Sequence, residues 1–311
     1  MSDPQLQLVD FHCHHVPPDL LTSQPQPDTP AAARTRRLLT DLDALLHGTD
    51  GADVDQRVVS IPAEQFAPAG RPPAATQLQR NNDCLAELVQ RHRGRLLGLA
   101  TVDAFSGTGG ADEVRRAHRD LGLRGIFVES AQGDLLLDAP QAQPALEAAA
   151  ALRMPVFVHP INPTGLTERM APFGRLGQRF ARGTVNGATL LALLEGGTFD
   201  ALPDLQIVVT TLAIGGVLLA SAFGDPPRLR AGTAEALRRH VYIDTMGFDA
   251  ALIRATVSLL GADHVLLGSD WPIDAAPIRA RALAAFAAAG LDDAEQALIA
   301  HGNARRLLAA G

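Results

Sequence analysis

The strongest constraint on the fold of this chain is a regular alternation of short apolar segments with amphipathic ones. Stretches rich in Ala and Leu with the period of a helix separate most of the apolar segments. Strands that alternate with helices predict βαβ units and a parallel sheet, and eight such units favour a closed (β/α)8 TIM barrel over an open, doubly wound sheet. The eight apolar segments are Leu6–His12, Arg57–Pro62, Leu96–Val102, Gly125–Glu129, Val156–His159, Ile207–Leu212, Val241–Thr245 and Val265–Asp270.

The alternative is a dinucleotide-binding sheet, but the first apolar segment is not followed by the G-x-G-x-x-G pattern of such folds. It runs instead into Asp10-Phe-His-Cys-His-His. Hydrophobic residues make up 47% of the 311 residues and aromatic residues only 4%, which indicates an aliphatic core of strands buried on both faces. We therefore predict one barrel domain over residues 1–311.

The composition of the chain excludes some classes of binding partner and indicates a cellular location. The net charge of −7 argues against nucleic acid or an anionic membrane, because both bind basic surfaces. Two cysteines, Cys13 and Cys84, are too few for a disulfide framework and fit a reducing compartment. The first residues do not resemble a signal peptide, and no apolar run approaches the roughly 20 residues of a membrane span. We expect a cytoplasmic protein.

Three connections are longer than a minimal βα loop, at residues 16–34, 63–76 and 160–187. Each follows the carboxyl end of a predicted strand, where barrel enzymes place their chemistry. They are therefore predicted to be lid-like or specificity loops. For the first of them, a disordered surface excursion is an equally good interpretation.

The first predicted strand ends in a His-x-His motif. Side chains two residues apart in a strand share a face, so His12 and His14 both point into the barrel mouth if the strand continues to His14, with Cys13 turned outward. Two imidazoles on one face suit zinc or a similar divalent ion. In a chain with ten histidines the motif alone is weak evidence, and its position at a strand end gives it weight.

Two more ligand-type residues end other predicted strands, His159 the fifth and Asp270 the eighth. Each has a structural alternative, since His159 could be a hydrogen-bonded residue at a strand end and Asp270 could cap the next helix. A barrel brings these strand ends together with the first. We therefore predict one divalent ion held by the two histidines of the first strand, His159 and Asp270.

The sequence also resembles a known family, the amidohydrolase-related family that includes 2-amino-3-carboxymuconate-6-semialdehyde decarboxylase and related decarboxylases, hydratases and lactonases. The resemblance covers nearly the whole chain and implies the barrel and the metal site, while it leaves the reaction open. The similar motifs are Asp10-Phe-His-Cys-His, Phe157-Val-His-Pro, Pro203-Asp-Leu-Gln-Ile-Val-Val, Gly268-Ser-Asp-Trp-Pro and Gly302-Asn-Ala-Arg-Arg-Leu.

The chain departs from this family at the end of the sixth predicted strand. The resemblance implies a histidine there that serves decarboxylases as acid or base, but Thr211 takes its place. A threonine hydroxyl does not titrate near neutral pH and cannot carry a proton as imidazole does. We predict that Glu129, at the end of the fourth strand, replaces it as a catalytic group, with Thr211 contacting the substrate. Asp244, near the end of the seventh strand, and His15 are the other candidates. For each of the three, the alternative is a residue that orients a ligand imidazole or a solvated loop residue.

A small anionic substrate is predicted from the arginines of residues 160–187, because a planar guanidinium can bind both oxygens of a carboxylate. The four arginines are Arg169, Arg175, Arg179 and Arg182, and at least one of them is expected to meet the substrate, with Arg169 and Arg175 as the first candidates. The alternative for each is a solvated basic loop. Trp271, the one tryptophan of the chain, follows Asp270 and is predicted to line the pocket or to pack beneath the loop.

Three functions fit these residues. The main prediction is a metal-dependent hydrolase of a small carboxylated substrate, in which the ion activates water and Asp270 takes its proton, because this chemistry needs no histidine on the sixth strand. The resemblance favours a metal-dependent decarboxylase of a small unsaturated or aromatic acid. The missing histidine also permits a catalytically silent barrel that binds a ligand.

Zinc is the predicted metal, since three nitrogens and one oxygen suit its four-coordinate geometry. Manganese is the alternative, because selectivity in cells does not follow affinity alone. A homodimer is expected by analogy with similar barrel enzymes, without a residue that marks the interface.

Overall fold

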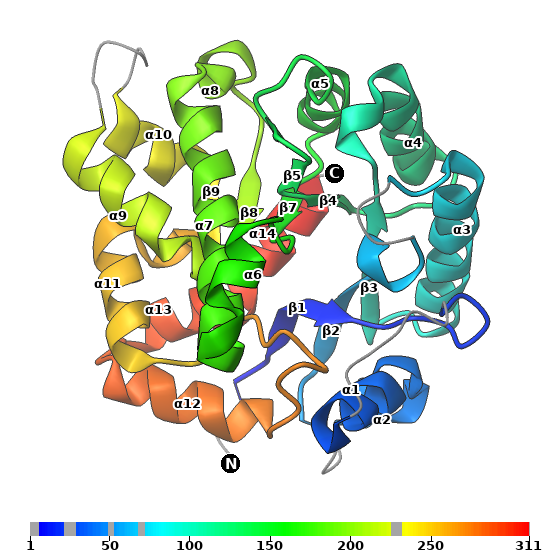
Figure 1. Cartoon of the computed structure of the whole chain (residues 1–311). Coiled ribbons are helices and arrows are strands. Elements are labelled where there is room, and N and C mark those ends of the chain that lie inside the picture. Colours follow the sequence, from blue (N-terminus) through cyan, green and yellow to red (C-terminus); the bar gives the residue numbers. More distant parts are fainter. Residues whose placement is uncertain (1–5, 22–28, 49–52, 68–71, 225–231, 311) are drawn as a thin grey trace.

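The computed structural model describes residues 6–21, 29–48, 53–67, 72–224 and 232–310 (Figure 1). Its main sheet has eight parallel strands in the order β1-β2-β3-β4-β7-β8-β9-β10. Each strand overlaps one of the eight apolar segments, so the prediction of a (β/α)8 barrel is confirmed. The strands are β1 (Val9–His14), β2 (Gln56–Ser60), β3 (Leu96–Thr101), β4 (Gly125–Glu129), β7 (Val156–His159), β8 (Ile207–Val209), β9 (Val241–Asp244) and β10 (Val265–Leu266).

The barrel closes where β1 meets the residues that follow β10. The backbone N–H of Phe11 donates to the carbonyl of Leu267, and that of Asp270 donates to the carbonyl of His12, at 2.8 Å each. Cys13 and Trp271 form a further parallel bridge. This closure sets the segment around Asp270 directly alongside the His-x-His motif, although the two lie at opposite ends of the chain.

Helices surround the barrel (Figure 1). None of those in the described residues is both long and apolar enough to cross a membrane. The longer helices are α1 (Pro30–Thr40), α3 (Ala75–Arg91), α4 (Thr108–Arg119), α5 (Gln143–Ala151), α7 (Gly174–Glu195), α9 (Ile214–Phe223), α10 (Thr233–His240), α11 (Ala250–Leu260), α12 (Ile278–Ala288) and α14 (Asn303–Ala310). The shorter elements are α2 (Leu42–His47), α6 (Leu166–Met170), α8 (Thr198–Ala201), α13 (Asp293–Ala297) and a hairpin of β5 (Ala131–Gln132) and β6 (Leu135–Leu136).

Two apolar clusters fill the fold. The larger lies between the strands and the helices and is mostly aliphatic, as the composition predicts. The smaller fills the barrel itself and differs from that prediction, because it contains the rings of Phe11, Phe127, Phe157 and Tyr242. Residues of α14 join this inner cluster, and Figure 1 shows α14 behind the barrel. The interior is thus filled up to the level at which the strands end.

The connection over residues 160–187 differs from the predicted loop, since most of it is helical. It contains α6, a 3-10 turn (η3, Ala171–Phe173) and the first part of α7. The glycines that suggested a loop allow close packing instead. A Cβ on Gly183 would lie 2.5 Å from the carbonyl oxygen of Leu212, in the 3-10 turn η4 (Thr211–Ala213) that follows β8. Helix α7 therefore packs directly against the barrel mouth.

The other two predicted lids are described only in part. In the first, the residues from Pro30 onward belong to α1; in the second, Ala63–Gln65 form a 3-10 turn (η1) and α3 begins at Ala75. Residues 22–28 and 68–71, the centres of these connections, lie outside the described residues. Their role as lids stays a prediction.

Candidate metal centre

Both histidines of the first motif lie at the barrel mouth, because β1 continues to His14. The register of β1 against β2 shifts between Asp10 and Cys13, an irregularity that can turn adjacent residues to the same side. Phe11 and His12 accordingly both contact the ring of Phe157 inside the barrel, at centroid distances of 6.2 and 4.8 Å. Cys13 points outward into the core beneath the helices.

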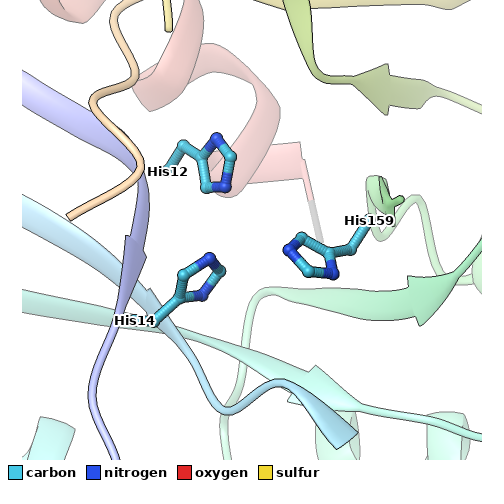
Figure 2. Close-up of side chains that lie close together, drawn as sticks. All are labelled: His12, His14 and His159. Carbon is cyan, nitrogen blue, oxygen red and sulfur yellow. The ribbon is translucent and has the colours of Figure 1, made fainter. Parts of the chain in front are cut away.

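The imidazole of His159, at the end of β7, meets those of His12 and His14 (Figure 2). Potential ligand atoms of the three rings lie within 4.8 Å of one another, and all three residues are buried. One carboxylate oxygen of Asp270 lies 3.4 Å from the Nε2 atoms of both His12 and His14. The structure therefore brings the four predicted ligands together.

Hydrogen bonds orient two of the rings for metal binding. Nδ1 of His12 lies 2.6 Å from a carboxylate oxygen of Asp244, which can only accept, so Nδ1 carries the proton. Nδ1 of His14 lies 2.9 Å from the hydroxyl of Ser60. Because that hydroxyl donates to the carbonyl of Cys13, it is left to accept from His14. In both rings this leaves the lone pair on Nε2.

These two Nε2 atoms are buried and have no hydrogen-bond partner among the described residues. A buried polar atom without a hydrogen-bond partner destabilises the folded state, so such atoms are rare unless they bind a ligand, a water molecule or an ion. Two such atoms that face one carboxylate, with a third imidazole beside them, fit a divalent ion bound by three nitrogens and one oxygen. The residues present therefore fit the predicted metal.

Burial dominates the electrostatics of the site. It holds the pKa of His14 below its usual value and that of His159 well below, where the guanidinium of Arg182 adds to the effect. Burial also lowers the pKa of His12, but Asp270 and Asp244 together outweigh it and raise that pKa. For Asp270, the neighbouring histidines outweigh burial and hold the pKa of the carboxyl below its usual value. The site thus offers a carboxylate and at least two neutral imidazoles.

Thr211 lies next to these ligands, but its hydrogen bonds go to Asp244. Its backbone N–H donates to Oδ1 of Asp244 at 2.8 Å, and its hydroxyl lies 2.9 Å from the same oxygen. Thr211 therefore reaches the metal ligands through Asp244, and its predicted contact with the substrate stays a prediction. Asp244, which the sequence offered as a proton carrier or as a residue that orients a ligand ring, contacts the ring of His12. Ser60 was not among the predicted site residues, although it ends β2, which is the signal that could have identified it.

Glu129 ends β4, where it is the register partner of His159. Its side chain is largely buried, and burial raises its pKa to about 7; Glu64 and Asp103 add to this rise, while Arg182 opposes it. Near neutral pH the carboxyl of Glu129 is therefore close to half protonated, which is the condition for a group that must both give and take a proton.

The two predicted substrate-binding arginines lie on the helices that follow β7. Arg169 and Arg175 are exposed on α6 and α7, and their contact with a substrate stays a prediction. Arg182, one turn after Arg179 on α7, is only 15% exposed, and its Nη2 lies 3.3 Å from Nε2 of His159. This arginine was grouped with the others in the sequence, and its burial sets it apart.

Trp271 has no exposed surface, and the guanidinium of Arg57 lies over its ring at 4.9 Å. Its ring is therefore part of the packed interior, and its predicted role in lining the pocket stays a prediction.

Several known proteins resemble this chain in sequence. The sequence pattern of the family described as Amidohydrolase matches residues 9–309. The chain is 29% identical over 292 residues to γ-resorcylate decarboxylase of Rhizobium radiobacter, covering 87% of this chain and 88% of that one. It is 27% identical over 243 residues to 2-amino-3-carboxymuconate-6-semialdehyde decarboxylase of Dictyostelium discoideum, covering 75% and 67% of the two chains.

Among solved structures, a dihydroxybenzoic acid decarboxylase of Polaromonas with bound manganese and the inhibitor 2-nitroresorcinol has a TM-score of 0.80 to this chain. The two share 23% identity over 97% of each chain, which supports the fold. The family pattern spans the whole barrel and includes all four predicted metal ligands. This chain therefore belongs to the amidohydrolase family.

Proposed function

We propose that this protein is a metal-dependent decarboxylase of a small hydroxylated aromatic acid. The observation that carries the proposal is the position of Glu129, whose largely buried carboxyl lies at the end of β4 beside His159. In the metal-free site burial raises its pKa to about 7. Decarboxylation replaces a carboxylate on carbon by a proton, so the enzyme needs a group that is protonated near neutral pH next to the substrate. The decarboxylase relatives support this reaction more than the hydrolysis that was the main prediction from the sequence.

A divalent ion held by His12, His14, His159 and Asp270 would bind and polarise oxygen atoms of the substrate. The side chains of the protein would transfer the proton. Glu129 in its acid form would donate its proton to the ring carbon that bears the carboxylate. The bond to the carboxylate would then break, carbon dioxide would leave, and the electron pair of that bond would restore the aromatic ring. Glu129, left as a carboxylate, would recover a proton from water.

Manganese and zinc both suit three imidazoles and one carboxylate. The manganese in the Polaromonas relative supports manganese for this chain, and the ligand geometry supports zinc equally well. Metal analysis of protein purified without chelator should find about one equivalent of either ion, and a His12→Ala/His14→Ala variant should contain none.

The test of the reaction is carbon dioxide release from 2,6-dihydroxybenzoate and other hydroxybenzoates by protein loaded with manganese or zinc. We expect turnover by the natural protein and a loss of about 10²- to 10⁴-fold in Glu129→Gln, whose amide matches the carboxyl in size but cannot donate a proton to carbon. The metal content of the variant should be unchanged. Full activity in Glu129→Gln would rule out its proposed role.

Hydrolysis of a small carboxylated substrate is the second candidate, and the position of Asp270 favours it. A carboxylate oxygen 3.4 Å from both Nε2 atoms can take a proton from water at the same site. The activities of two variants distinguish hydrolysis from decarboxylation. A hydrolase should lose lactone or amide hydrolysis in Asp270→Asn and keep it in Glu129→Gln. A loaded protein that turns over neither class would support the silent barrel.

A further inference from the structure

We infer that Arg182 binds the anionic group of the substrate, and that Glu64 is the internal counter-ion that the substrate displaces. The inference deepens the proposed function and rests on it for the class of substrate, a small acid.

Among the four arginines of residues 160–187, Arg182 is the one whose side chain reaches the metal ligands. Helix α7 carries it there, because the contact of Gly183 with Leu212 brings this helix against the barrel mouth. Arg175 and Arg179, earlier on the same helix, are exposed. A buried guanidinium at a metal site has lost most of its hydration, so it must interact with anions or acceptors in its surroundings.

The contact between Arg182 and His159 indicates that Arg182 needs an anionic partner when an ion is bound. A guanidinium is only a donor, so Nε2 of His159 must accept, and the ring is protonated on Nδ1. The lone pair that Arg182 contacts is therefore the one that would face the ion. An ion bound there and the guanidinium would both be positive and close together. Such a pair is stable only when an anion lies between or beside the two charges.

Among the described residues, Asp270 lies on the side of the metal ligands, and the carboxylate paired directly with Arg182 is that of Glu64. A carboxylate oxygen of Glu64, in η1 after β2, lies 3.5 Å from Nη1 of Arg182. The side chain of Glu64 is 41% exposed, and exposed pairs at such distances are easily exchanged. A substrate carboxylate could contact the ion with one oxygen and Arg182 with the other, which the planar fork of a guanidinium favours.

The same position explains how the substrate would be presented to the proton donor. Arg182 lies 3.3 Å from His159 and 3.5 Å from Glu64, and Glu129 is the register partner of His159 on the neighbouring strand. The three side chains therefore lie around the same histidine. An acid bound between the ion and Arg182 would hold the carbon that carries its carboxylate on the side of Glu129. The geometry thus selects for a carboxylate attached directly to the reacting carbon.

The test measures binding, by calorimetry on the zinc-loaded protein, of salicylate and of its neutral isostere salicylamide. Natural protein should prefer salicylate. We expect Arg182→Gln to weaken salicylate at least tenfold with little effect on salicylamide, and Glu64→Gln to strengthen salicylate several-fold. Arg179→Gln, on the exposed side of the same helix, is the matched control and should behave as the natural protein. Equal losses for both ligands, or no loss for salicylate, would overturn the inference.

A second measurement separates anion binding from a merely structural role. Arg182→Gln removes the donor that occupies the lone pair of His159, so this variant should bind zinc at least as tightly as the natural protein in competition with a chelator. Weaker zinc binding would show that Arg182 only supports the fold. If salicylate binds through Arg182 but no hydroxybenzoate is decarboxylated, the proposed function fails and the inference stands. If Arg182→Gln decarboxylates hydroxybenzoates at full kcat/KM, the proposed function stands and the inference about Arg182 fails.

Discussion

Thr211 holds Asp244 through two donors: its backbone N–H donates to Oδ1 of the aspartate, and its hydroxyl lies 2.5 Å from the backbone carbonyl of Asp244 and 2.9 Å from Oδ1. The backbone N–H of Met246 adds a third contact to the same oxygen at 3.2 Å. The other oxygen of Asp244 is thereby left to accept from Nδ1 of His12. At the position where the resemblance implies a proton carrier, this chain has a residue that orients a metal ligand.

We predict that Thr211→Val weakens metal binding, because it removes the hydroxyl that supports Asp244. Loss of a partner that orients a ligand imidazole typically costs about 10- to 100-fold in metal affinity. Thr211→Ser keeps the hydroxyl and should restore most of the affinity. Competition with a chelator measures both variants. Equal metal affinity in the valine and serine variants would show that the backbone N–H alone holds Asp244.

Gly268 is predicted to be essential for the spacing of the same residues. A Cβ at this position would lie 2.8 Å from Cβ of Asp244 and 2.9 Å from Cβ of His12. Gly268→Ala should therefore push the two side chains apart, with a loss of bound metal and of about 1–3 kcal/mol in the free energy of unfolding. Gly215→Ala is the control, since a Cβ there meets nothing within 4 Å. Metal content and urea unfolding would show the difference between the two.

The four metal ligands could be predicted because they depend only on where strands end. A parallel barrel brings the carboxyl ends of its strands together whatever the details of packing, and His12, His14, His159 and Asp270 lie at or just beyond such ends. The match to the amidohydrolase family covers residues 9–309, a range that contains all four.

The position of Arg182 could not be predicted in this way. The glycines and prolines of residues 160–187 are typical of a loop, and their helical structure depends on a tertiary contact, that of Gly183 with Leu212. The aromatic interior is a similar case. Phe11 faces inward beside His12 because the register of β1 shifts against β2. The alternating pattern of a regular strand does not predict such a shift.

Glu129 predicts a pH-dependent effect on the stability of the metal-free protein. Its pKa is about 7 when folded, above the usual value of 4.5, so the folded state binds the proton more tightly than the unfolded state. Stability therefore falls as the pH rises from the lower value to the higher one. Glu129→Gln carries no such charge and should have a higher Tm than the natural protein at pH 8, with a smaller difference at pH 5. The same difference at both pH values would contradict the raised pKa.

Asp10 and Arg57 form a buried ion pair next to the metal ligands. We predict that replacing one of the two residues destabilises the fold more than replacing both. Their side chains are 2.8 Å apart and almost entirely buried, and the hydroxyl of Ser269 also donates to Asp10. Asp10→Asn would leave the buried charge of Arg57 with only the more distant carboxylate of Asp53, 3.9 Å away. Breaking a buried ion pair typically costs about 3–5 kcal/mol, and Asp53 should reduce that loss. A double variant, Asp10→Asn with Arg57→Met, removes both charges and should recover part of that loss. Urea unfolding of the metal-free proteins measures this coupling, and a double variant as unstable as the sum of the two single ones would show that the residues act independently.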